Sequence, residues 1–148
     1  MTPRTPRGCI LVLGLASLLI GGCSSTGISD KDLTFLGPDQ AMEEVQGHKR
    51  LLGLAGESSG AWVDVRPAEA FKAGHIPGAI NLPLDRVNAD HGELSKYDAL
   101  VVYGESYSDP KAEALSKRLI QLGHESVFTL RGGMQAWTTA GNTTETGE

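Results

Sequence analysis

Apolar residues in this chain occur in short runs, which polar and glycine-containing segments separate. These runs predict strands over residues 33–36, 61–65, 79–81, 100–103 and 127–130. The run at 100–103 is apolar at each position, as in parallel strands that are covered on both faces. Residues 47–60 are punctuated by four glycines and predict no definite element.

Between the strands, the pattern changes to the spacing of helices, which are predicted over residues 38–46, 67–73, 110–122 and 134–139. The helix over 110–122 has the clearest boundaries. Asp109 suits the N-cap, Pro110 the first helical position, and Gly123 the C-terminal stop. Alternating strands and helices favour βαβ crossovers, so the fold class is α/β with a mainly parallel sheet.

The N-terminus carries an apolar stretch of twelve residues, 9–20, between a basic start and Gly21-Gly22-Cys23. Such a stretch is short for a bilayer span but fits the apolar region of a secretory signal. Residues 19–23 resemble a bacterial lipoprotein signal, in which the cysteine is acylated and becomes the new N-terminus. The resemblance predicts a signal peptide over 1–22, then a lipidated Cys23 and a polar tether over 23–32. The alternative is an ordinary signal peptide with an incidental cysteine.

This interpretation places the chain in the bacterial cell envelope, on the periplasmic or extracellular face, with the membrane as a partner through Cys23. Stable anchoring takes more than one acyl chain. The chain has only one other cysteine, Cys9, so the exported domain over 33–140 has no disulfide and no thiol. The net charge of −5 argues against nucleic acid as a partner. The polar tail over 141–148 is expected to be disordered.

Three segments, in order, resemble the rhodanese-like domain family. The first is Val63-Asp64-Val65-Arg66 with Phe71 and the sequence Gly-His-Ile-Pro-Gly-Ala-Ile-Asn at 74–81. The second is the strand at 100–103, and the third is Leu-Arg-Gly-Gly-Met-Gln-Ala-Trp at 130–137. The family implies a three-layer fold over 33–140, with a central, mainly parallel sheet and helices on both faces. Its active members carry a cysteine directly after the strand that 100–103 resembles, and this thiolate accepts sulfane sulfur as a persulfide.

The chain departs from the family at this position, because Gly104 stands where the cysteine would be. The loop continues to the next helix as Glu105, Ser106, Tyr107, Ser108 and Asp109. Without a thiol, persulfide transfer by the family mechanism is excluded, and no catalytic residue is predicted. The two carboxylates stand where an oxyanion such as thiosulfate would bind. Asp109 is expected to cap the helix with its own carboxylate; the alternative is a vacant anion cradle.

Other candidate residues have simpler interpretations. Ser106 and Ser108 lack a recognisable base and orienting acid, so serine catalysis is not favoured. The four histidines show no metal-ligand spacing, and we predict no metal and no cofactor. The remaining family positions are expected to be structural: Asp64, Arg66, His75, Gly132, Gly133 and Trp137. Tyr107 is the one candidate whose position in the loop suggests exposure. It is either an exposed anchor for a partner or a ring folded over the loop.

Two functional hypotheses of different class follow, with a weaker third. The first is a non-catalytic rhodanese-like module that binds an envelope protein or a small ligand through residues 104–109. The alternative is a sulfurtransferase, as the family resemblance alone would suggest, although fold does not imply function. The third is a purely structural envelope protein.

Overall fold

The computed structural model describes residues 27–47, 59–107 and 109–147. The predictions for the signal peptide, Cys23, most of residues 47–60 and Ser108 lie outside these residues. Five parallel strands form one sheet in the order β1-β5-β4-β2-β3. In chain order the strands are β1 (Thr34–Leu36), β2 (Gly60–Asp64), β3 (Ile80–Asn81), β4 (Ala99–Tyr103) and β5 (Val127–Leu130).

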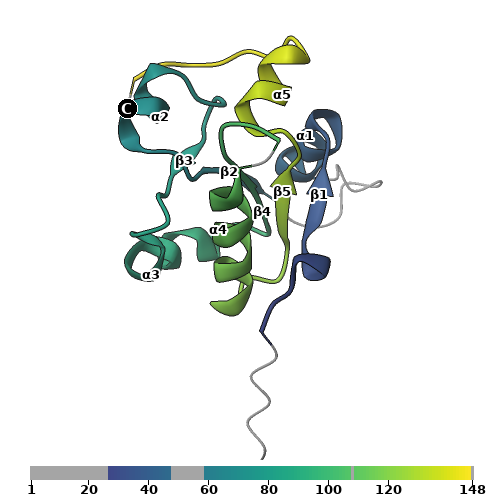
Figure 1. Cartoon of the computed structure of the whole chain (residues 1–148), viewed down its shortest axis with the longest axis vertical. Coiled ribbons are helices and arrows are strands. Elements are labelled where there is room, and N and C mark those ends of the chain that lie inside the picture. Colours follow the sequence, from purple (N-terminus) through teal and green to yellow (C-terminus); the bar gives the residue numbers. More distant parts are fainter. Residues whose placement is uncertain (1–26, 48–58, 108, 148) are drawn as a thin grey trace, which may run out of the picture.

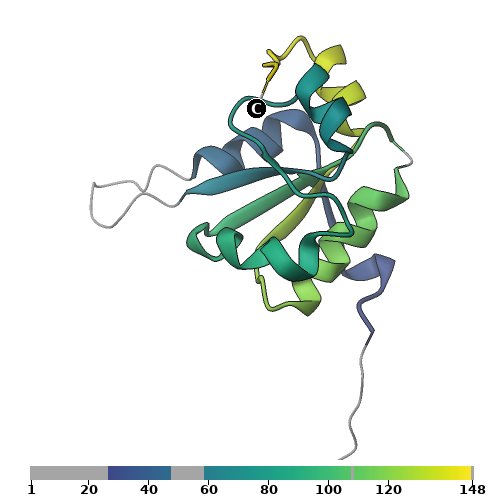
Figure 2. The same cartoon turned by 90° about the vertical axis from the view of Figure 1, so that its left-hand side faces the viewer.

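Helices cover both faces of this sheet, which confirms the predicted three-layer α/β fold (Figures 1 and 2). One face packs against α3 (Val87–Asp90), the 3₁₀ segment η2 (His91–Lys96) and α4 (Pro110–Gln121). The other face packs against α1 (Pro38–Gln46) and α5 (Gly133–Thr139). A short helix, α2 (Ala68–Ala73), follows β2, and a 3₁₀ turn, η1 (Asp30–Asp32), precedes β1. No helix in the described part of the chain has both the length and the apolarity that crossing a bilayer needs.

The core forms two layers because side chains on a strand alternate between faces. In β4, Leu100 and Val102 pack on the side of α4, whereas Val101 and Tyr103 pack on the side of α1 and α5. All four side chains are almost completely buried. Burial on both faces accounts for the uninterrupted apolar run in the sequence, as expected for a central parallel strand.

Parallel pairing brings the carboxyl ends of all five strands to one edge of the sheet, where ligands of α/β folds commonly bind. The segments that follow β2, β4 and β5 meet at this edge (Figure 1). They include Arg66, the loop from Gly104 to Asp109, and the glycine pair Gly132 and Gly133. The predicted site residues of the three sequence segments are therefore close in space.

The C-terminal segment differs from the predicted disordered tail. Glu145 exchanges two backbone hydrogen bonds of 2.9 Å with His75, and its Oε1 accepts a 2.7 Å bond from the N–H of Gly78. The indole of Trp137 donates to the carbonyl of Thr143 at 2.7 Å. The prediction of disorder rests on the polar composition of the tail alone. In the folded chain, Glu145 instead forms hydrogen bonds with backbone groups of the turn after α2.

Candidate functional site

The loop between β4 and α4 lies on the N-terminus of α5. The N–H of Met134 donates to the carbonyl of Gly104 at 2.9 Å, and the N–H of Gln135 donates to the carbonyl of Glu105 at 3.0 Å. Such a close approach requires Gly133, which has a φ of 53° and where an added Cβ would lie 2.8 Å from the carbonyl carbon of Gly104. The glycine pair in the third sequence segment thus positions the loop.

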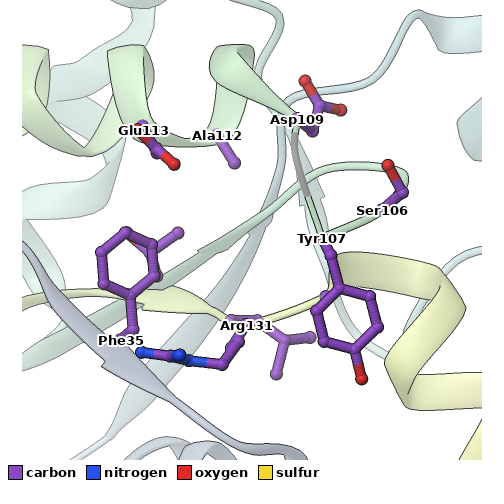
Figure 3. Close-up of a pocket in the computed structure, with 10 residues that line it drawn as sticks. Phe35, Ser106, Tyr107, Asp109, Ala112, Glu113 and Arg131 are labelled. Carbon is purple, nitrogen blue, oxygen red and sulfur yellow. The ribbon is translucent and has the colours of Figure 1, made fainter.

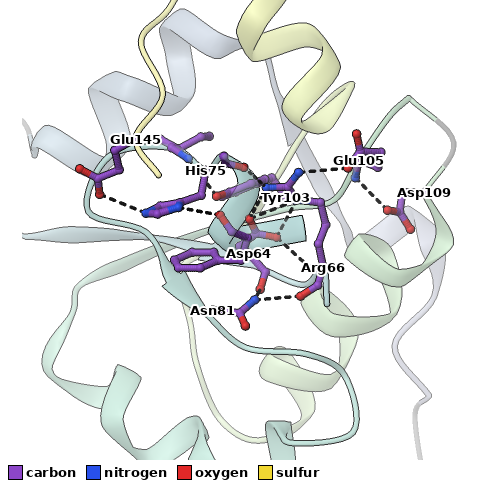
Figure 4. A network of polar contacts seen from close by, with 11 residues as sticks. Asp64, Arg66, His75, Asn81, Tyr103, Glu105, Asp109 and Glu145 are labelled. Atoms are coloured by element: carbon purple, nitrogen blue, oxygen red, sulfur yellow. Dashed lines mark hydrogen bonds and ion pairs between the residues drawn. The ribbon is translucent and has the colours of Figure 1, made fainter. Parts of the chain in front are cut away.

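Asp109 caps α4, as the sequence predicts. Its Oδ1 accepts a 3.0 Å hydrogen bond from the N–H of Lys111, and its Oδ2 accepts a 2.9 Å bond from the N–H of Glu105 at the start of the loop. One carboxylate therefore satisfies donors at both ends of the loop, and Figure 4 shows its contact with Glu105. Converging N–H groups at a helix N-terminus favour negative charge, and here that charge belongs to the protein itself.

The same carboxylate fills the space beside Gly104. A Cβ added at this glycine would lie 2.7 Å from Cγ and 3.0 Å from Cβ of Asp109. Asp109 is short and held by two N–H groups, so it cannot yield this space without losing hydrogen bonds. The space that a side chain at position 104 would need is thus occupied.

Arg66 connects the loop to the sheet through a network of charged groups (Figure 4). Its guanidinium donates to both carboxylate oxygens of the buried Asp64 at 2.8–3.2 Å, to the carbonyl of Gly74 at 2.6 Å, and to Oε2 of Glu105 at 3.0 Å. Burial by itself lowers the pKa of Arg66, but the hydrogen bonds and charge of Asp64, together with Glu105, raise this pKa above its ordinary value. The cation is therefore permanent, and each of its three nitrogens donates to a protein group.

His75 and Tyr103 lie beneath this network and are buried. The Nδ1 of His75 is 2.8 Å from the carbonyl of Phe71, on whose ring the imidazole stacks at 3.7 Å. The hydroxyl of Tyr103 accepts a 3.2 Å bond from the N–H of Ile76, while burial, and then the charge of Asp64, raise its pKa. These contacts hold the turn after α2 against the sheet and leave neither group facing the loop as a free acid or base.

Tyr107 combines the two expectations for it. Its side chain is 65% exposed, yet its ring lies over Gly132, where an added Cβ would be 2.7 Å from Cζ of the ring. The ring borders a pocket of about 250 Å³ between β1, β5 and α4 (Figure 3). Arg131 lies in this pocket with its guanidinium 5.4 Å from the ring centre of Phe35. Sequence reasoning did not single out this pair, because Phe35 lies in β1 and Arg131 directly follows β5, far apart in the sequence.

The other sequence candidates take no part in the hydrogen-bond network around Gly104. Trp137 packs edge-on against Trp62 at 5.1 Å in the core. Ser106 lines two pockets beside the loop, and neither contains a histidine among the described residues. Two histidines that the sequence shows as scattered, His91 and His124, come into contact at the opposite edge of the sheet. The arrangement near Gly104 offers an acidic loop, held at both ends by Asp109, with one exposed aromatic ring and no thiol.

Comparisons with known proteins agree with this architecture. Residues 47–140 match the family model described as "Rhodanese-like domain". Over 81 residues the chain is 30% identical to "Adenylyltransferase and sulfurtransferase UBA4" of Meyerozyma guilliermondii, a match that covers 51% of this chain and 19% of that protein. Over 76 residues it is 29% identical to "Putative sulfur carrier protein YrkF" of Bacillus subtilis, covering 51% of this chain and 40% of that protein. The chain therefore spans less than half the length of these curated relatives.

The crystal structure of the BH2092 protein from Bacillus halodurans is similar over a larger share of both chains. It superimposes with a TM-score of 0.62 at 28% sequence identity, and the match covers 78% of this chain and 79% of that chain. The order of elements seen here is thus shared with a protein of known structure.

Proposed function

The chain belongs to the rhodanese-like domain family, and from this premise we propose that it uses the family's active-site loop for binding and not for sulfur transfer. The partner is an envelope protein or a small ligand that contacts residues 104–109. The chain is held at the membrane through a lipid on Cys23.

The position of the Asp109 carboxylate carries this proposal. Sulfur transfer by a thiolate needs a cysteine side chain. It also needs surrounding N–H groups that stabilise the negative charge of the thiolate and of its substrate. Gly104 supplies no side chain, and Asp109 takes both the space and two of the N–H groups that such chemistry would use. The protein's own carboxylate thus already occupies the anion site of the loop, which favours recognition of the loop's outer surface.

Tyr107 and Glu105 form that outer surface. Tyr107 is 65% exposed, and the Glu105 side chain is 68% exposed although its carboxylate pairs with Arg66. An exposed tyrosine offers both an apolar ring and a hydroxyl to a partner. The adjacent pocket of about 250 Å³ extends this surface to Arg131.

A sulfurtransferase is the second candidate. It is supported by the family itself and by the two curated relatives, whose descriptions contain the terms sulfurtransferase and sulfur carrier. The two candidates differ in a measurable way, because sulfur transfer from thiosulfate to cyanide yields thiocyanate.

We expect the purified chain to form no thiocyanate above background, with Cys9 and Cys23 replaced by serine so that no other thiol reacts. Gly104→Cys alone is expected to remain inactive and to unfold more easily, because its Cβ meets the Asp109 side chain. The double variant Gly104→Cys/Asp109→Ala removes the carboxylate from the space beside position 104 and frees two N–H groups. We therefore expect this variant to transfer sulfur slowly. Formation of thiocyanate by the cysteine-free chain would contradict the proposal. An inactive but folded double variant would show that Asp109 is not what closes the site.

The proposed partner at the loop and the proposed lipid anchor at Cys23 are tested together in cells. A photo-crosslinking amino acid at Tyr107 is expected to give a discrete adduct in the membrane fraction, whereas the same group at exposed Gln121, at the far end of α4, gives none. Cys23→Ser is expected to release the chain and its adduct from the membrane fraction. Equal adducts from both positions would contradict a partner at the loop, and an unchanged membrane fraction would contradict the lipid anchor.

A further inference from the structure

His91 and His124 meet at the edge of the sheet opposite the Gly104 loop. His91 begins η2, and His124 lies between α4 and β5, 33 residues further along the chain. The Nδ1 of His91 is 3.4 Å from the Nε2 of His124, and the two ring planes are nearly perpendicular, at 88°. Neither the fold nor the proposed function of the loop explains this pair.

The separation of the two nitrogens is long for a hydrogen bond and matches that of two ligands on one metal ion. Hydrogen bonds from N–H groups to oxygen usually span about 2.7–3.2 Å, and 3.4 Å between the two ring nitrogens is at the long end for a hydrogen bond. Zinc binds histidine at about 2.0–2.1 Å in a tetrahedral arrangement, which separates two ligand nitrogens by about 3.3–3.4 Å. The rings are therefore spaced as two ligands of one such ion.

The surroundings favour a cation. Both rings are half-buried and line a pocket of about 310 Å³ together with Asp98 and Glu125. In the part of the chain that the structure describes, no lysine or arginine lines this pocket.

We propose that His91 and His124 together bind one divalent transition-metal ion, of the class represented by Zn²⁺. Within the described residues, no group of three or more histidine, cysteine, aspartate or glutamate side chains is arranged to hold a metal. Two imidazoles therefore supply the protein ligands, and water fills the other positions from the open pocket. Imidazole nitrogens suit zinc, copper and nickel, whereas magnesium and calcium prefer oxygen ligands.

Zinc titration calorimetry of the purified chain tests this site, with Cys9 and Cys23 replaced by serine so that no thiol competes. We expect one Zn²⁺ per chain and an affinity that falls at least tenfold in His91→Ala and in His124→Ala. His48→Ala, a histidine elsewhere in the sequence, is expected to leave the affinity unchanged. His91→Asn separates the two roles of the pair, since an amide can still hydrogen-bond to His124 but is a poor zinc ligand.

Thermal unfolding gives a second readout that does not depend on calorimetry. Zn²⁺ in excess should raise the Tm of the parent and of His48→Ala, and leave that of His91→Asn unchanged, because a ligand stabilises only the state that binds it. The proposal is overturned if binding is not saturable, or if it persists in the His91→Ala/His124→Ala double variant. It is equally overturned if His91→Asn binds zinc as tightly as the parent.

Discussion

Replacing Gly133 with alanine is expected to lower the free energy of unfolding by about 3 kcal/mol. The residue has a φ of 53°, where a side chain costs about 1 kcal/mol. The new Cβ would also lie 2.8 Å from the carbonyl carbon of Gly104 and 3.1 Å from that of Glu105. Relieving these contacts separates α5 from the loop and breaks two backbone hydrogen bonds, each contributing about 1 kcal/mol.

Denaturant unfolding followed by circular dichroism measures this loss. Gly92→Ala is the matched control, because an added Cβ there meets nothing within 4 Å and its φ does not lie in the left-handed region. Gly92→Ala is expected to stay within about 0.5 kcal/mol of the parent. If the two variants unfolded at similar denaturant concentrations, the close approach of α5 to the loop would not be a source of stability.

Asp64→Ala is expected to cost about 3–5 kcal/mol, because it leaves the guanidinium of Arg66 buried without its main partner. Asp64 is completely buried, and Arg66 is only 6% exposed. The remaining acceptors of the guanidinium, Glu105 and the carbonyl of Gly74, replace neither the charge nor the geometry of the lost carboxylate.

The second carboxylate of the same arginine provides the comparison. Glu105→Gln removes an ion pair whose acidic side chain is 68% exposed, so a loss of no more than about 1 kcal/mol is expected. Both variants are compared with the parent by the same unfolding measurement. Equal losses at positions 64 and 105 would mean that burial does not set the strength of this network.

The sequence predicts the parts of the fold that local patterns encode. The apolar run of β4 and the helix of α4, with its Asp109-Pro110 start, are confirmed because their signals lie within a few adjacent residues. α3 and η2 were not predicted, since Val87 and Leu94 are the only fully buried residues of these two short elements. Single buried residues give no period from which to recognise a helix.

The site could be predicted only in part, for a related reason. Gly104 and Asp109 are each visible as unusual residues in the loop, and the capping role follows from helix chemistry. That Gly104 and Asp109 depend on each other does not follow from the sequence, because it rests on the direction in which the Asp109 side chain points. Long-range contacts such as His91 with His124, or Glu145 with His75, exist only after the chain has folded.

The common direction of the five strands, combined with the proposed anchor at Cys23, would also orient the molecule relative to a membrane. η1 leads into β1 at the amino-terminal edge of the sheet, while the Tyr107 loop lies at the carboxyl edge (Figure 1). If the chain is held at Cys23 as proposed, residues 24–29 can span at most about 20 Å. The lipid then keeps the amino-terminal edge, with His91 and His124, near the bilayer. The acidic loop points away from it, within reach of proteins in the aqueous compartment.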